Sequence, residues 1–239
     1  MVARRKQHTV APAGPVREVH YRESDGKPMA ESDEHRDEMV RLIQTLQAAF
    51  ADRPDVYVSG NMLLYYEEGN PRASVAPDVF VVMGVPKLPK RRIYKLWEEG
   101  APPLLVIEVT SPSTRREDRT KKHDLYARLG VREYVLYDPL GEYLRPPLQG
   151  YRLREGAYIP MDIVHSALLS EAFPIRFALD GSRLLLIDAN TGTAMPTPSE
   201  RLAADLEATR ALVSALQQQA AAAKARITEL ERRLDRGTP

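Results

Sequence analysis

The chain has 239 residues, of which 43% are hydrophobic and 28% charged, and its formal net charge at pH 7 is +1. This length and composition are typical of one globular domain with an appendage, and they argue against a largely disordered chain and against two large domains. Because the sequence contains no cysteine, it excludes disulfides, iron-sulfur clusters, thiolate metal sites and cysteine nucleophiles.

The N-terminal residues show neither a signal core nor a membrane span. The basic run Arg4-Arg5-Lys6 is followed by Pro12 and Pro15 instead of an apolar stretch, and no apolar run in the chain approaches the roughly 18 residues of a membrane helix. We therefore expect a cytoplasmic protein with no membrane partner. Residues 1–19 lack periodicity and are predicted to form a flexible N-terminal arm.

The first predicted element is an amphipathic helix that begins after Ser32. This serine is suited to cap a helix whose first turn holds Asp33 and Glu34. The apolar residues that follow recur at helical spacing: Met39, Leu42, Ile43, Leu46 and Phe50. The pattern predicts a helix that packs one face inward.

Short strands follow the helix. The segment from Val56 to about Glu67 is β-branched and aromatic and is interrupted at Gly60-Asn61, so it predicts two short strands or a bent hairpin. Residues 77–83 predict a strand with a proline at its start. Residues 84–103 predict a basic insertion that contains a short helix around residues 93–99.

A strand-helix-strand unit forms the expected centre of the domain. Residues 104–109 are apolar except for Glu108, as in a central strand, and residues 133–139 predict a second strand. Between them, Thr114 and Glu117 form a capping-box pattern for a helix that ends at Gly130. Helical spacing places five residues on its inward side: Asp118, Lys122, Leu125, Tyr126 and Leu129.

The remainder of the chain predicts strands and then one long helix. Apolar segments up to Asp188 predict antiparallel strands that complete the sheet. Over residues 198–236, apolar or small residues alternate by four and three: Leu202, Leu206, Thr209, Val213, Leu216, Ala220, Ala223, Ile227, Leu230 and Leu234. This heptad pattern predicts a coiled coil that links two copies in a homodimer, and the alternative is an alanine-rich helix packed on its own domain.

Asp78 and Glu108 are the strongest candidates for chemistry. Each belongs to a predicted strand, and if these strands are neighbours the two carboxylates meet. A carboxylate in an apolar strand needs a compensating partner, which Lys122 or a hard divalent cation shared with Asp78 would supply. Two acids, a lysine and a metal are suited to phosphodiester hydrolysis. A buried ion pair without catalysis is the alternative interpretation.

The order of these motifs resembles the Uma2 family, which belongs to the PD-(D/E)XK nuclease superfamily. The resemblance covers roughly residues 20–190. It rests on the following motifs: Pro77-Asp78, residues 105–114, Asp118-Arg119, Lys122, Tyr126, Gly130-Val131, Glu133-Tyr134 and Asp138-Pro139. It implies a restriction-endonuclease-like α/β fold, in which a mixed sheet is flanked by helices.

The resemblance also implies roles for individual residues. Asp78 and Glu108 correspond to the two metal-binding acids, with Mg²⁺ or Mn²⁺ as the ion. Thr110 stands where the superfamily usually has its lysine, and Lys122 matches the position to which this lysine has migrated in the family. Glu23 resembles an additional N-terminal acid near the metal, and His35 matches a histidine that opens the first helix, with either a structural or a ligating role.

The basic residues of the central helix are candidates for contacts with DNA. Arg115, Arg116 and Arg119 flank the expected site, where they would contact the phosphate backbone without reading sequence, although a charged run on a helix is often only a solvated face. The sequence thus predicts a homodimeric, Mg²⁺-dependent DNA endonuclease. The alternatives are an RNA-directed nuclease and a catalytically silent nucleic-acid-binding or scaffold protein that acts through its coiled coil.

Overall fold

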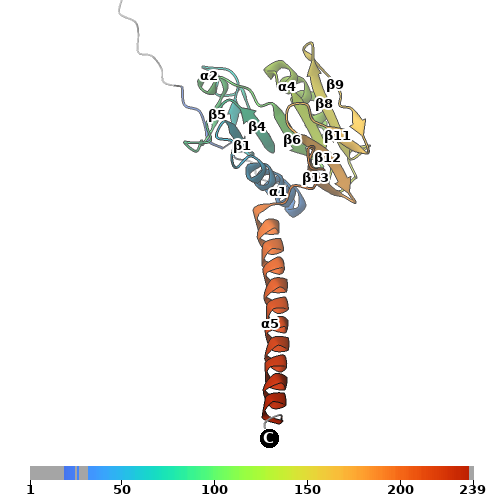
Figure 1. Ribbon diagram of the computed structural model, residues 1–239. Coiled ribbons are helices and arrows are strands. Elements are labelled where there is room, and N and C mark those ends of the chain that lie inside the picture. The colour runs from blue at the N-terminus through green and yellow to red at the C-terminus, as the bar shows by residue number, and fades with distance from the viewer. Residues whose placement is uncertain (1–18, 25, 27–31, 237–239) are drawn as a thin grey trace, which may run out of the picture.

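A six-stranded mixed sheet forms the centre of the protein (Figure 1). The computed structural model describes residues 19–24, 26 and 32–236. The sheet contains, in spatial order, β1 (Val56–Ser59), β4 (Val79–Met83), β6 (Leu105–Val109), β7 (Glu133–Tyr137), β8 (Leu148–Arg154) and β9 (Ala157–Pro160). Strands β6 and β7 are parallel and the other neighbours are antiparallel. The predicted α/β class with a mixed sheet is confirmed.

Two smaller sheets accompany the central one. The first comprises β2 (Leu64–Tyr65), β3 (Ser74–Val75) and β5 (Tyr94–Lys95). The second comprises β10 (Ile163–Val164), β11 (Ala167–Leu169), β12 (Ile175–Asp180) and β13 (Arg183–Asp188). The expectation that the last strands complete one sheet is therefore wrong beyond β9. Strands β12 and β13 bury alternate residues such as Phe177 and Leu186 in the core, so they pack on the central sheet instead of extending its edge.

Helix α1 (Asp33–Ala49) begins as the sequence predicts. The Ser32 hydroxyl accepts a hydrogen bond from the His35 backbone N–H at 3.2 Å and so caps the first turn. The inward face of the helix buries Met39, Leu42 and Leu46. Helix α2 (Leu96–Glu99) is a single short turn within the predicted insertion.

The central helix differs from the regular helix that the sequence predicts. It consists of α3 (Arg115–Glu117), a π-helical turn η1 (Asp118–Lys122) and α4 (His123–Leu129), and it ends at left-handed Gly130. Thr114 does not form the predicted capping box, because its hydroxyl instead contacts the backbone N–H and hydroxyl of Ser111, at 3.2 and 2.9 Å. Such wide turns are frequent at functional sites.

The central sheet is buried on both faces, as expected for strands that are apolar throughout. One face packs against α1 and the β10–β13 sheet, with Ile107 among its residues. The opposite face packs Val106 against aromatic residues that include Tyr126 and Tyr134. Because side chains alternate along a strand, Glu108 lies on the same face as Val106.

Helix α5 (Pro198–Arg236) extends away from the domain (Figure 1). Its start is a capping box, because the Thr197 backbone N–H donates to Glu200 at 2.8 Å and the Glu200 N–H donates to Thr197 at 3.2 Å. The helix forms over the predicted residues, and it does not pack back on its own domain. The predicted N-terminal arm, apart from Val19, lies outside the described residues. No helix among the described residues is long and apolar enough to cross a membrane.

Candidate active site

The fold places Asp78 beside Glu108. Strand β4 pairs antiparallel with β6, with Val79 opposite Ile107, so the residue before Val79 falls next to the one after Ile107. The Asp78 backbone N–H donates to Glu108 Oε2 at 3.3 Å, and the Val109 N–H donates to Asp78 Oδ2 at 2.8 Å. The two carboxylates thus share one network at the end of β6.

Glu108 is completely buried, and both of its carboxylate oxygens accept hydrogen bonds. The Tyr126 hydroxyl of α4 donates to Oε1 at 2.7 Å, and the Lys122 ammonium donates to Oε2 at 2.9 Å. These partners offset the cost of removing the carboxylate from water. They also fix its orientation, because both oxygens are held.

Lys122 links two acids. Its Nζ lies 2.9 Å from Glu108 Oε2 and 2.9 Å from Asp118 Oδ1, and its side chain is only 13% exposed. Asp118 and Lys122 are the first and last residues of η1. The π-helical turn therefore presents both residues to the sheet, while Lys121 is exposed.

The surroundings of the acids move their pKa values in opposite directions. Burial raises the pKa of Glu108 well above its usual range, although Lys122 opposes this shift. Burial alone would also raise the pKa of Asp78, but the hydrogen bond with His35 and the charge of Lys122 lower it below its ordinary value. Carboxyl groups separated in this way are suited to different roles in acid-base chemistry.

Burial raises the pKa of Asp118 as well, against the attraction of Lys122. For Lys122 itself, burial disfavours the charged form, but Glu108 and Asp118 outweigh it and the pKa ends above its usual value. Lys122 is therefore protonated at neutral pH.

Helix α1 and the β1–β2 connection hold Asp78 in place. His35 Nε2 lies 3.2 Å from Asp78 Oδ2, so the histidine that opens α1 supports the first acid. Gly60 lies directly against the Asp78 backbone, where an added Cβ would come within 2.0 Å of the Asp78 carbonyl oxygen. The Asn61 N–H also donates to the Pro77 carbonyl at 2.8 Å.

Glu23 lies in a different environment from the other candidate acids. Its carboxylate forms an ion pair with Arg92 at 2.8 Å, and its side chain is 50% exposed. Among the described residues, Glu23 forms neither a hydrogen bond nor an ion pair with Asp78 or Glu108. The structure thus gathers Asp78, Glu108, Lys122 and His35, and leaves Glu23 outside their network.

The three arginines of the predicted DNA contact lie together. Arg115, Arg116 and Arg119 are exposed, and with Thr120 and Tyr143 they line a hollow of about 380 Å³. The Arg115 guanidinium lies over the Tyr143 ring, 5.5 Å from its centroid. We call these three arginines and Tyr143 the arginine patch.

Lys122 also reaches the surface, in a second hollow. A groove of about 850 Å³ lies among β3, α4 and the β8–β9 hairpin, and its lining includes Tyr66, Lys121, Lys122, Arg128 and Tyr158. A substrate in this groove would have access to the Lys122 side of the site.

Three residues of the site, Asp118, Tyr126 and Gly60, were assigned no role from the sequence. Asp118 and Tyr126 fall on the predicted inward face of the central helix with Lys122, so their spacing carried the signal. From the sequence, Gly60 was interpreted only as a break between two strands. Its contact with Asp78 could not be predicted, because it joins segments that are distant in the chain. Thr110 is buried at the position of the usual lysine, and its hydroxyl makes no hydrogen bond to the described residues.

The donor set at this site suits a hard cation only in part. Asp78 and Glu108 offer carboxylate oxygens, and Mg²⁺ commonly binds one or two carboxylates, with waters and phosphate oxygens completing its shell. Among the described residues, no three histidine, aspartate or glutamate side chains are arranged as a complete metal site. The protein fits an ion that keeps several waters better than one held in a closed protein cage.

The part of the chain that contains this site matches the model of a known protein family. The model of the Uma2 family, described as "Putative restriction endonuclease", matches residues 15–182, which is more than half of the chain. The chain belongs to the Uma2 family. Its matched region contains Asp78, Glu108, Asp118 and Lys122, and it ends before α5.

Membership of the Uma2 family supports a nuclease as the class of activity. A solved structure from Anabaena variabilis ATCC 29413, titled as a putative nuclease belonging to DUF820, is 15% identical with a TM-score of 0.45. The match covers 61% of this chain and 76% of that chain. No curated protein matches the chain.

Proposed function

We propose that this Uma2 protein is a PD-(D/E)XK-type endonuclease that hydrolyses DNA phosphodiester bonds with Mg²⁺ or Mn²⁺. The observation that carries the proposal is the shared network of Asp78, Glu108 and Lys122, in which two carboxylates and one ammonium converge at the end of β6. A buried ion pair that serves stability alone would not require the second acid, Asp78, beside it.

Each residue of this network has a distinct role in the proposal. Asp78 and Glu108 would hold the divalent ion, which when bound supplies charge stabilisation at the phosphate and an acidified water. Lys122 would hold the scissile phosphate by its charge, since its pKa lies above the usual value and it stays protonated. His35 and Gly60 would act as positioning residues, because both contact Asp78.

The two surface hollows indicate where DNA would lie. The groove beside Lys122 exposes Lys121 and Arg128, and the arginine patch lies on the preceding turns of the same central helix. Contacts from these side chains to the DNA backbone would give affinity without sequence specificity. We propose that the duplex crosses this helix, with one phosphate at Lys122.

We also propose that two copies of the chain associate through α5 as a coiled coil. The support is the exposure of the predicted seam, since Leu202, Leu216 and Leu230 are 69%, 55% and 53% exposed. A dimer would supply two nuclease sites, which could address the two strands of a duplex.

A substrate panel tests the proposal. Supercoiled plasmid, linear duplex, single-stranded DNA and RNA are incubated with the protein and Mg²⁺ or Mn²⁺, in parallel with Asp78→Asn. We expect metal-dependent cleavage of DNA by the wild type, reduced at least about 100-fold in the variant. Cleavage of RNA alone would make the protein an RNA-directed nuclease. Folded wild type that neither binds Mn²⁺ in calorimetry nor cleaves any substrate would support the catalytically silent scaffold instead.

A further inference from the structure

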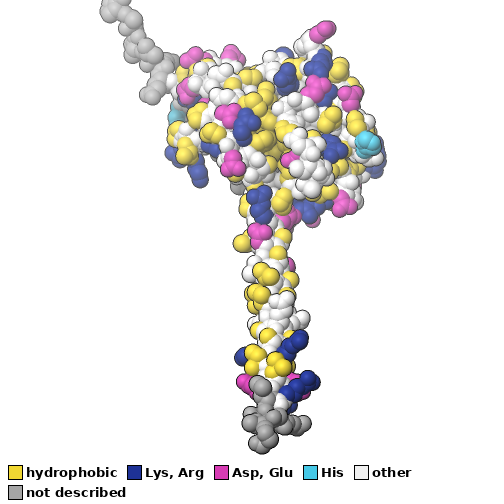
Figure 2. Space-filling view, in the orientation of Figure 1, with side chains coloured by type: hydrophobic (Ala, Val, Ile, Leu, Met, Phe, Trp, Pro, Cys, Tyr) yellow, Lys and Arg dark blue, Asp and Glu magenta, His cyan; other side chains and the backbone are white. Residues whose placement is uncertain are grey.

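Helix α5 is an unpaired surface with a strongly patterned side. Every described side chain from 198 to 233 is exposed, and the helix has no contact with the domain beyond its root (Figures 1 and 2). Its exposed large apolar residues are Leu202, Leu206, Leu212, Val213, Leu216, Ile227 and Leu230. All except Leu212 lie on the seam that alternates by four and three. An exposed apolar stripe of this length is typical of a surface that binds a partner, because leaving it in contact with water is unfavourable.

The residues of the seam select the number of strands. The alternation fixes the heptad register, with Leu206, Val213, Ala220, Ile227 and Leu234 at position a. The d positions are then Leu202, Thr209, Leu216, Ala223 and Leu230. β-branched residues at a combined with leucine at d favour two parallel strands over three or four. Val213 and Ile227 provide the former, and three of the five d positions provide the latter.

Charges beside the seam distinguish parallel from antiparallel pairing. In a parallel, in-register pair, each g residue faces the e residue five positions further along the other helix. Asp205 then faces the partner's Arg210, and Arg226 faces the partner's Glu231, so both charged g–e pairs are attractive. In an antiparallel pair over the same length, Asp205 faces the partner's Arg233, which is attractive, but Arg210 faces the partner's Lys224 and these two cations repel. Both charged pairs are therefore favourable only in the parallel arrangement.

The ion pairs within the helix do not oppose this arrangement. Arg210 contacts Glu207 at 2.9 Å, but both side chains are more than 60% exposed. Such an exposed pair contributes little free energy, so Arg210 can exchange it for the partner's Asp205 at little cost. The charge pattern therefore remains available for association.

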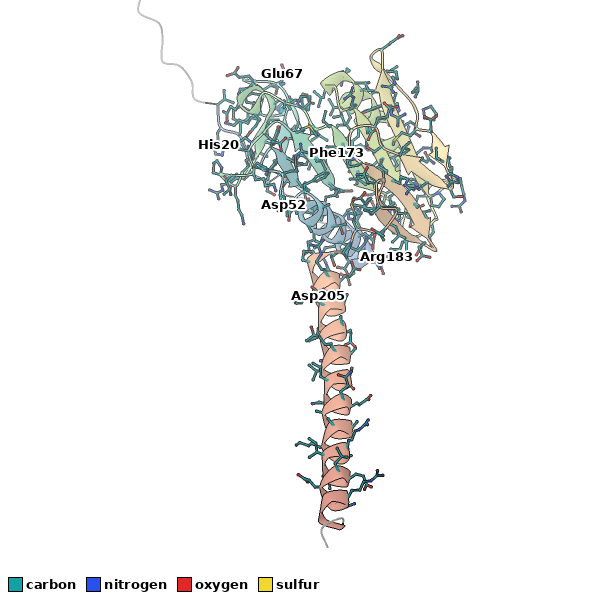
Figure 3. The ribbon with its side chains drawn as sticks, viewed as in Figure 1. His20, Asp52, Glu67, Phe173, Arg183 and Asp205 are labelled. Atoms are coloured by element: carbon teal, nitrogen blue, oxygen red, sulfur yellow. The ribbon has the colours of Figure 1, made fainter. Side chains whose placement is uncertain are left out.

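The root of α5 is joined to the domain by specific contacts. Arg183 of β13 forms an ion pair with Glu200, and the Met195 N–H donates to the Leu186 carbonyl at 2.7 Å. Figure 3 labels Arg183 at the base of the helix and Asp205 just beyond it. The direction in which two α5 helices pair thus determines where both domains lie.

We infer that α5 pairs with α5 of a second copy as a parallel, in-register, two-stranded coiled coil, which places both nuclease domains at the same end. The inference rests on the self-association proposed above and adds its strand number and direction. An antiparallel coil would instead separate the domains by about the length of the 39-residue helix, roughly 60 Å at 1.5 Å per residue. Only the parallel form brings two sites to one short stretch of duplex.

Engineered cysteines test the direction, because the chain has none of its own. Leu206→Cys and Leu230→Cys are oxidised separately and as a mixture and are examined on non-reducing gels. A parallel coil gives covalent dimers from each variant alone. An antiparallel coil gives none from either alone and a dimer only from the mixture, which would overturn the inference. Ala211→Cys, on the outer side of the seam, is the control and should not cross-link in either case.

A second measurement leaves every seam residue in place. A spin label at Ala204→Cys, on the outer side near the root, gives a short distance between the two copies in a parallel coil. In an antiparallel coil the label would lie about 42 Å further along the axis from its counterpart, given 28 residues of rise. Light scattering that finds only monomers would refute the association itself. Plasmid cleavage by the same samples is read separately, so loss of nuclease activity and loss of pairing are distinguished.

Discussion

The variant Lys122→Met tests whether the Lys122 ammonium offsets the free-energy cost of burying the carboxylates of Glu108 and Asp118. The lysine lies 2.9 Å from both Glu108 and Asp118, whose side chains are 0% and 1% exposed. Removing one partner of such a pair leaves an uncompensated buried charge and costs about 3–5 kcal/mol. For a protein of this size, we expect the melting temperature to fall by about 6–20 °C. Methionine keeps most of the apolar stem, so the loss reports the charge.

The pH dependence of this loss identifies its cause. Burial already raises the pKa values of Glu108 and Asp118, and losing the lysine raises them further. The folded variant then takes up protons at a higher pH than the unfolded chain, whose acids titrate near 4. The variant therefore gains stability, relative to the wild type, as the pH falls from 8 towards 5.

Urea unfolding of both proteins across this pH range measures the difference, with Lys121→Met as the matched control. The exposed Lys121 shares the helix but not the ion pairs, so its replacement should change the free energy of unfolding by less than about 0.5 kcal/mol. A deficit in Lys122→Met below about 1 kcal/mol, or one that stays constant with pH, would refute the account of the site's electrostatics.

Three further predictions follow from other parts of the chain. Gly60→Ala should displace Asp78, because the new Cβ would come within 2.0 Å of the Asp78 carbonyl oxygen. Calorimetry should show weaker Mn²⁺ binding, and the free energy of unfolding should fall by about 1–3 kcal/mol. Unchanged binding would mean that Gly60 does not position the acid. Arg116→Gln should weaken binding to all DNA sequences alike and reduce the slope of log affinity against log salt by about 1, as fluorescence anisotropy would show, whereas an unchanged slope would remove the arginine patch from the interface. Ala220→Ile, at a seam position, should tighten self-association at least about tenfold in sedimentation, while the outward Ala221→Ile should leave it unchanged; equal effects would argue against the seam.

Much of the fold follows from local patterns in the sequence. Helix α1, with its Ser32 cap, and the two strands around the central helix follow from apolar patterns that the sequence shows clearly. The sequence could not predict that β8 and β9 join the central sheet while β10–β13 form a second sheet. A short apolar strand has the same sequence pattern in both situations. The π-helical turn was not predictable either, because Asp118 and Lys122 have the same four-residue spacing that a regular α-helix would show.

The candidate site was predictable where residues belong to adjacent elements. The odd carboxylate in an apolar strand indicated Glu108, and the helical stripe indicated Lys122 rather than Lys121. Contacts between distant segments were not visible, and the approach of Gly60 to Asp78 is one of them. The family motif places Glu23 near the metal, and this role stays a prediction, while the structure pairs its carboxylate with Arg92.

The central claim is that the network at the end of β6 cleaves DNA, and one comparison tests it most directly. Supercoiled plasmid is incubated in Mg²⁺ with the wild type, Glu108→Gln and Asp52→Asn, the last altering an exposed acid in the turn after α1. Our account predicts nicking or linearisation by the wild type and Asp52→Asn at equal rates, with a rate at least about 100-fold lower for Glu108→Gln. Equal cleavage by folded Glu108→Gln would contradict it.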